Sequence, residues 1–190
     1  MSEPSDLFRN LTREDFKLIS FDFEQLSKRL QGSEDWAKLV VCHIYLDHII
    51  SQTLKDHVPN IDAYFAGGHK SFSDKLALCQ AHNLIDDEIA MTLRSINSAR
   101  NKFAHRLVFD VPDEVKTRLF LEFSPARPPG DVLTDDGFSN FLFTVVMLVE
   151  FERIYGIKLA NIEREAAFHR GKMLEIAIEM IGGGAFKSAN

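Results

Sequence analysis

Cysteine, basic charge and long apolar runs are all scarce in this sequence. The 190 residues include only Cys42 and Cys79, too few for a disulfide framework, so we expect free thiols in a reducing compartment. Acidic residues (28) outnumber basic ones (22), and the net charge of −6 argues against a protein that coats duplex DNA over its whole surface. The longest apolar run covers only residues 141–149 and is interrupted by Thr144, whereas a transmembrane helix needs about 20 residues.

Glycine, proline and targeting signals are also limited. With 10 Gly and 6 Pro, the chain is neither collagen-like nor of low complexity. Its N-terminus has no basic segment followed by an apolar stretch, so no signal peptide is predicted. A hydrophobic content of 45% with 16 Phe predicts a folded protein with a phenylalanine-rich core. We therefore expect a cytoplasmic protein without membrane contact.

Helical periodicity runs through nearly every long segment, and period-two alternation is almost absent, so we predict an all-α bundle of about six to seven helices. We expect a helical N-terminal extension over residues 1–32, a bundle domain over 33–181 and a flexible tail over 182–190. Residues 5–31 are predicted to form one or two short helices. The other predicted helices cover residues 34–57, 71–82, 86–109, 113–122, 138–155 and 160–181. Residues 60–70 and 124–137 are predicted connectors, and Gly182 to Gly184 are predicted to end the last helix.

Two polar residues lie within the predicted core-facing stripe of the helix over 34–57. At about 100° per residue, His43 and Asp47 fall among Leu39, Ile50 and Leu54, while Cys42 is predicted to face away. A buried carboxylate needs a donor. Either His43 and Asp47 bond each other one turn apart, or Asp47 orients a residue of another helix. We predict Asp47 within hydrogen-bond reach of His43 or of Arg100 or His105 on the helix over 86–109.

Within the helix over 86–109 lies the one long helical segment that is locally positive in a chain that is acidic overall. From Ile89 to Phe109 it contains no acidic residue. Such a stretch is the natural place for a phosphate. The polar arc beside its buried stripe and the neighbouring basic positions hold Arg94, Asn97, Arg100, Asn101, Lys102, His105 and Arg106.

Three of these side chains suit RNA cleavage without a metal. His105 can exchange a proton near neutral pH, Arg100 can stabilise charge that builds at phosphorus, and Asn101 can orient either group. Such a site would let the 2′-hydroxyl of RNA attack the neighbouring phosphate. The alternative is that the arc is simply a solvated basic face, because this spacing is common in helices by chance.

The segment FSDKLALCQAHNLIDDEIAMTLRSINSARNKFAH, residues 72–105, resembles the mannitol-operon repressor-like family. The preceding IYLDHIISQTL, residues 44–54, fits the same pattern, and the similarity covers roughly residues 33–160. More broadly, the stretch from Arg100 to His105 is similar to the RNxxxH motif of HEPN domains. That resemblance implies an up-and-down helical bundle, a homodimer and a metal-independent endoribonuclease of toxin, defence or RNA-processing type.

The resemblance also implies roles for single residues. Arg100 would bind the scissile phosphate, His105 would act as general acid or base, and Asn101 would support them. Asp47 would hold Arg100 or His105, with His43 as a further supporting residue. The phosphate groups of RNA would also meet Arg94, Lys102 and Arg106 in a basic groove, and in HEPN dimers two such motifs usually face each other.

Other function classes remain as alternatives. The family name implies transcriptional regulation, but no helix-turn-helix signature is present, so we expect action through a protein partner rather than sequence-specific DNA binding. An antitoxin-like or nucleotide-sensing bundle is a third interpretation. The histidines and cysteines lack metal-ligand spacing, so we predict no metal and no cofactor. The apolar helix over 138–151 suggests a homodimer interface.

Overall fold

The computed structural model describes residues 12–106, 110–124, 128–134 and 136–185, with the side chains of 104–106, 129 and 176–185 outside the description. Every regular element within these residues is helical, which confirms the predicted all-α bundle of six to seven helices. The elements are the 3-10 helices η1 (Asp15–Leu18) and η2 (Pro129–Leu133) and the α-helices α2 (Phe23–Gln31), α3 (Asp35–His57), α4 (Ile61–Ala66), α5 (Phe72–Ala81), α6 (Asp87–Arg106), α7 (Asp113–Phe123) and α8 (Gly137–Ala185).

The chain divides into two compact units, Met1–Ile154 and Tyr155–Asn190, which we describe separately. The boundaries predicted from the sequence follow residues 32 and 181, and the two compact units divide within α8. Helix α2 is part of the first unit, because its Leu26 and Leu30 are fully buried in the common core. The described part of the second unit is the continuation of α8 alone.

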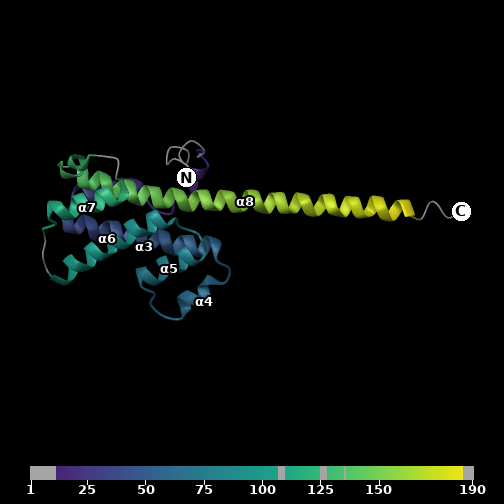
Figure 1. The fold of residues 1–190 in the computed structure, drawn as a ribbon, viewed down its shortest axis with the longest axis horizontal. Coiled ribbons are helices and arrows are strands. Elements are labelled where there is room, and N and C mark those ends of the chain that lie inside the picture. Colours follow the sequence, from purple (N-terminus) through teal and green to yellow (C-terminus); the bar gives the residue numbers. More distant parts are fainter. Residues whose placement is uncertain (1–11, 107–109, 125–127, 135, 186–190) are drawn as a thin grey trace. The chain divides into compact units, whose positions relative to one another are not determined.

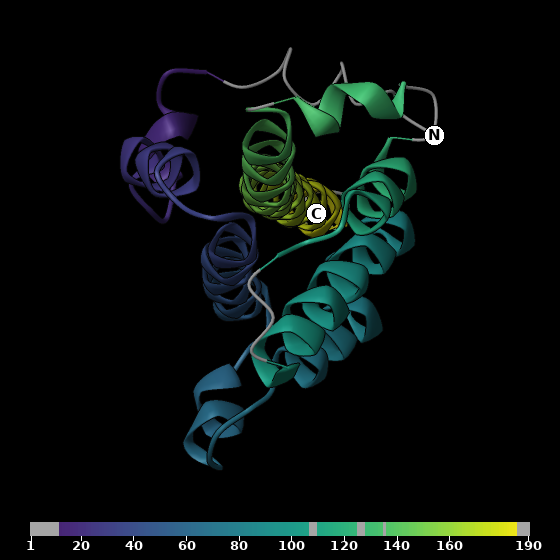
Figure 2. The same ribbon diagram turned by 90° about the vertical axis from the view of Figure 1, so that its left-hand side faces the viewer.

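Helix α3 is the central element of the first unit. It packs against α2, α5 and α6, and α6 packs in turn against α7 (Figure 1). In Figure 2 the start of α8, in green, lies among α2, α3 and α7. The largest fully buried side chains come from α2, α3, α5, α6, α7 and α8 and include Leu26, Leu30, Leu39, Leu46, Ile49, Ile50, Leu54, Leu76, Leu93, Ile96, Leu119 and Phe138.

Local sequence signals explain where α5 and α6 begin. Ser71 accepts a hydrogen bond from the backbone N–H of Asp74, whose carboxylate in turn accepts from the Ser71 N–H, so a full capping box starts α5. Asp86 accepts from the backbone N–H of Glu88 at 2.9 Å and places negative charge at the start of α6. These predicted starts are confirmed.

Several predicted boundaries are wrong. The connector over 60–70 contains α4, and the loop over 124–137 contains η2. The two helices predicted over 138–155 and 160–181 are one helix, α8, which continues through Gly182 to Gly184. No proline lies between the two predicted helices, and isolated glycines cost a helix only about 1 kcal/mol each, so neither Gly156 nor the glycine run has to end it.

The packing of α3 also corrects two orientations. Cys42, predicted to face away from the core, is fully buried, and Asp47, predicted within the buried stripe, keeps a side chain that is 36% exposed. Helix α3 has neighbours on several sides, so its buried face is wider than a single stripe and is centred nearer Leu46. The start of α8 proposed as a dimer surface is largely core, since Leu142 and Val146 are fully buried there.

Candidate functional site

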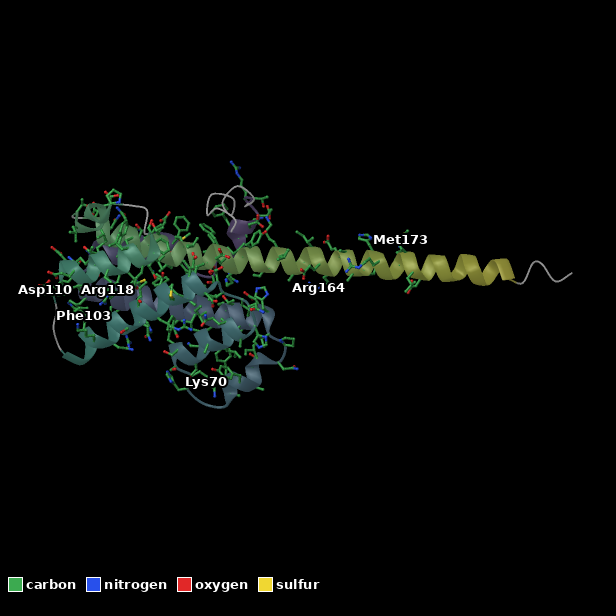
Figure 3. The ribbon with its side chains drawn as sticks, viewed as in Figure 1. Lys70, Phe103, Asp110, Arg118, Arg164 and Met173 are labelled. Atoms are coloured by element: carbon green, nitrogen blue, oxygen red, sulfur yellow. The ribbon has the colours of Figure 1, made fainter. Side chains whose placement is uncertain are left out.

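Three neighbouring helices contribute the polar side chains of the candidate site. Helix α6 carries Arg100 and Asn101, α3 carries His43 and Asp47, and α5 carries Lys75. Both α5 and α6 pack against α3, which brings these residues together from distant parts of the sequence. Figure 3 marks the same stretch of α6 by Phe103, whose ring is buried in the core cluster.

His43 is a buried histidine with a defined partner. Its Nε2 lies 2.9 Å from Oδ1 of Asn97, and its ring lies 4.8 Å from the ring of Phe72. Because an amide oxygen can only accept, the geometry assigns the proton to Nε2 of His43. A bond from His43 to Asp47 was one of the two predicted alternatives, and the structure gives His43 the partner Asn97 instead.

A chain of side-chain amides links His43 to Arg100. Oδ1 of Asn97 also lies 3.4 Å from Nδ2 of Asn101, and Nδ2 of Asn97 donates to Oγ of Ser73 at 3.4 Å. The Arg100 Nη1 donates to Oδ1 of Asn101 at 2.8 Å. The imidazole of His43 and the guanidinium of Arg100 are therefore joined through two asparagines that do not titrate. Through this chain, His43 and Arg100 constrain each other's position.

The electrostatic environment keeps His43 neutral. Burial lowers its pKa below the ordinary value of 6.5, and the positive charge of Arg100 lowers it further. The hydrogen bond to Asn97 and the carboxylate of Asp47 oppose this shift without reversing it. A neutral imidazole beside Arg100 adds no positive charge that would compete with the guanidinium for an anion.

Arg100 carries a charge that no described carboxylate neutralises. Its side chain is half-buried, and its Nε is buried without a hydrogen-bond partner among the described residues. Its one described hydrogen bond goes to the neutral amide of Asn101. A buried N–H without a partner is uncommon in folded proteins. A half-buried guanidinium without a carboxylate partner is suited to receive an oxyanion on its accessible atoms.

Asp47 has a different partner from those predicted. Its Oδ1 lies 2.5 Å from Nζ of Lys75, which also donates to Oγ of Ser51 at 3.1 Å. No described hydrogen bond joins Asp47 to Arg100 or His43, so that part of the prediction is wrong. The third predicted partner, the side chain of His105, lies outside the described residues. The reason is that α5 brings an ammonium group against α3, which sequence spacing does not reveal. Because Lys75 takes up the Asp47 carboxylate, the guanidinium of Arg100 keeps its full charge.

The remaining predicted residues are spread along α6. The backbone of His105 and of Arg106 belongs to α6, but both side chains lie outside the described residues. Lys102 is exposed, and Arg94 donates from Nη2 to Oε1 of Gln80 on α5. The described contacts thus join Arg100, Asn101 and His43, and they do not join Arg94 or Lys102 to this group.

Neither Asn97 nor Lys75 has a role in the predictions from sequence, yet Asn97 links His43 to Asn101 and Lys75 pairs with Asp47 beside them. A signal for Asn97 was available, because it lies one turn before Asn101 on the polar arc of α6. Lys75 gave no comparable signal, since its importance comes from the packing of α5 on α3 and from a side chain that is only 8% exposed.

Among the residues that the structure describes, no group of three or more His, Cys, Asp or Glu side chains could hold a metal ion. Both cysteines are buried, and burial raises the pKa of the Cys79 thiol to about 12 and that of Cys42 further still. Within the same described residues, no helix has the length and apolarity to cross a membrane.

Comparison of the chain with protein-family models, with curated proteins and with solved structures finds no match. The site must therefore be interpreted from its own geometry.

Proposed function

We propose that the surface of α6 around Arg100 binds the phosphate backbone of RNA and that the protein is a metal-independent endoribonuclease of HEPN type. The observation that carries this proposal is the guanidinium of Arg100, which is half-buried, is held by Asn101 and has no carboxylate partner among the described residues. In a chain of net charge −6, such a cation suits a local anion site rather than a general surface charge.

The proposed reaction needs only groups of the chain and of the RNA. The 2′-hydroxyl attacks the adjacent phosphorus and gives up its proton, the bond from phosphorus to the 5′-oxygen breaks, and that oxygen takes up a proton. The products are a 2′,3′-cyclic phosphate and a 5′-hydroxyl. His105 exchanges these protons as general acid or base, and Arg100 stabilises the negative charge on the phosphoryl oxygens.

The described network supports this role for Arg100. Asn101 fixes one edge of the guanidinium, and Asn97 and His43 fix Asn101 from behind. His43 is a positioning residue in this scheme, because it is buried and reaches Arg100 only through amides. Holding the guanidinium in place before substrate arrives lowers the cost of ordering it in the transition state.

The test is cleavage of a mixed RNA substrate by the purified protein in the presence of EDTA. We expect wild type to release fragments with 2′,3′-cyclic phosphate ends, and Arg100→Ala and His105→Ala to lose activity by at least about 100-fold. Arg118→Ala is the matched control, because Arg118 is an exposed arginine of α7 paired with Glu122 at 3.9 Å. A 2′-O-methyl RNA should stay intact. RNA left equally intact by wild type and His105→Ala would contradict cleavage.

The second candidate is a non-catalytic regulator that acts through protein contacts. It is favoured by the large apolar side chains that α8 exposes after Ile154, including Phe168 and Leu174 at 68% and 63% exposure. A stable complex with a partner protein that is unaffected by Arg100→Ala and His105→Ala, without cleavage of RNA, would support this candidate over the first.

A further inference from the structure

The second unit exposes a row of large apolar side chains on a single helix. Tyr155 is 39% exposed, Leu159 46%, Ile162 60% and Met173 68%. Apolar surface of this extent on one face of a helix marks an interaction site, because its removal from water is the main favourable term in association.

These residues recur with the spacing of a coiled coil. Steps of four and three residues alternate along the helix, which places every member of the row within one narrow stripe. The pattern continues over about three heptads, the minimum that indicates a coiled coil. We call this stripe the seam, and it consists of Tyr155, Leu159, Ile162, Ala166, His169 and Met173.

The charged residues that flank the seam fit a second copy of the same helix. One flank carries Lys158, Glu165 and Lys172, and the other carries Glu163 and Arg170. In a parallel pair, each residue of the first flank meets the residue five positions later on the opposite flank of the partner helix. Lys158 then meets Glu163 of the second copy, and Glu165 meets Arg170, so both pairs are opposite in sign.

The same charges disfavour an antiparallel pair. In an antiparallel alignment that buries all seam residues, each flank lies against the same flank of the second copy. Lys158 would then face Lys172 of the second copy, and Glu165 would face Glu165, so like charges would be opposed along that flank. The charge pattern thus selects both the partner and its direction.

We propose that residues 155–175 form a parallel, in-register coiled coil with a second copy of this chain. His169 is the one histidine of the seam, and in this arrangement it meets His169 of the second copy. An imidazole at this position specifies register, because a shifted alignment sets it against apolar side chains. The proposal does not depend on RNA cleavage.

The first test is the oligomeric state of the full chain by sedimentation equilibrium. We expect wild type to behave as a dimer, with about twice the 21.6 kDa mass of one chain, and Ile162→Asp and Met173→Asp to be monomers. Phe168→Asp is the matched control, because Phe168 is 68% exposed like Met173 but lies on the opposite side of the helix. This variant should remain a dimer.

The second test is orientation. Leu159→Cys should form a disulfide between two chains under mild oxidation, and the buried Cys42 and Cys79 should not interfere. In the antiparallel alignment the two introduced thiols would be offset by ten residues, or about 15 Å at 1.5 Å per residue. Glu165→Arg should weaken the dimer, and adding Arg170→Glu should restore it.

The proposal is overturned if wild type is a monomer at every concentration, or if Met173→Asp and Phe168→Asp have the same effect on the dimer. A dimer that depends on Met173 but forms no disulfide through Leu159→Cys would overturn the parallel arrangement.

Discussion

Asp47 and Lys75 form an ion pair that joins α3 to α5 beside the candidate site. The carboxylate of Asp47 is partly exposed, whereas the side chain of Lys75 is only 8% exposed. The loss of stability should therefore depend on which of the two residues is removed. Loss of Asp47 leaves a buried ammonium group with Ser51 as its remaining described partner, and burial of a poorly paired charge is costly.

Asp47→Ala should lower the free energy of unfolding by about 1–3 kcal/mol, because it strands the Lys75 ammonium. The double variant Asp47→Ala/Lys75→Met should recover most of this loss. Urea denaturation of the single and double variants measures both effects. Glu175→Ala, an exposed carboxylate of α8, is the control and should change stability by less than about 0.5 kcal/mol. An unchanged stability in Asp47→Ala would show that Lys75 does not need its carboxylate.

His43 should make stability depend on pH. Burial and the charge of Arg100 lower the pKa of His43 below 6.5 in the folded protein, so the unfolded chain binds more protons as the pH falls through 6.5. Stability should therefore fall on acidification below about pH 6.5. His43→Gln keeps a donor for Asn97 without a titrating group and should reduce this dependence.

The titration of the His43 ring by NMR measures the pKa directly. We expect a midpoint below 6.5 in wild type and a higher midpoint in Arg100→Gln, since that variant removes a cation that disfavours the imidazolium. A midpoint at the ordinary value in wild type would mean that the imidazole is not held in the buried position described above.

At the scale of elements, a buried ionic cluster fastens three segments of the first unit. Arg153 of α8 donates to Glu150 at 2.8 and 2.9 Å, to Asp56 of α3 at 2.5 Å and to the carbonyl oxygen of Leu18. Glu150 is fully buried and also accepts from the backbone N–H of Ser20 at 2.5 Å. The cluster thus joins α8 to α3 and to the segment before α2.

Arg153→Met should destabilise the protein by about 3–5 kcal/mol, because it leaves the Glu150 carboxylate buried without its cation. Thermal or urea unfolding measures the loss, and Arg153→Met/Glu150→Leu should restore much of it. Arg164→Met is the control, since Arg164, labelled in Figure 3, is exposed and bonded only to the neighbouring Asn161 among the described residues. If Arg164→Met lowered the free energy of unfolding as much as Arg153→Met, the buried cluster would not be the cause of the loss.

The elements themselves could be predicted where a local signal existed. The capping box at Ser71 and Asp74 and the acidic start of α6 are encoded within a few residues, and both helices begin as expected. Glycine predicts a helix end, yet α8 continues as a single helix, because each glycine costs a helix only about 1 kcal/mol. The burial of Cys42 depends on how many helices surround α3, which periodicity in one segment cannot show.

At the scale of the whole molecule, a net charge of −6 should confine the binding of RNA to a few cationic side chains. Each phosphate contact with single-stranded nucleic acid contributes about 0.7 to the salt dependence of the binding constant. Arg100→Gln should therefore reduce the slope of log K against log salt by about 0.7 for a 2′-O-methyl RNA that cannot be cleaved. Fluorescence anisotropy measures the slope, and Arg118→Gln should leave it unchanged.

The candidate site could be predicted only in part. The grouping of Arg100 with Asn101 follows from their adjacency on the polar arc of α6. The bond of His43 to Asn97 could not be predicted, because it depends on how α6 packs against α3. The partner of Asp47 could not be predicted, because it depends on how α5 packs against α3.

The two buried thiols allow the rate of local unfolding to be measured. Cys42 in α3 and Cys79 in α5 are buried, and Cys79 lies against the carbonyl oxygen of Ile50 in α3. Because only a thiolate reacts quickly with an alkylating reagent, neither sulfur should be modified while these helices remain packed. At high reagent concentration, the rate of alkylation then equals the rate at which α3 and α5 separate, so the native sequence contains its own reporter of local unfolding.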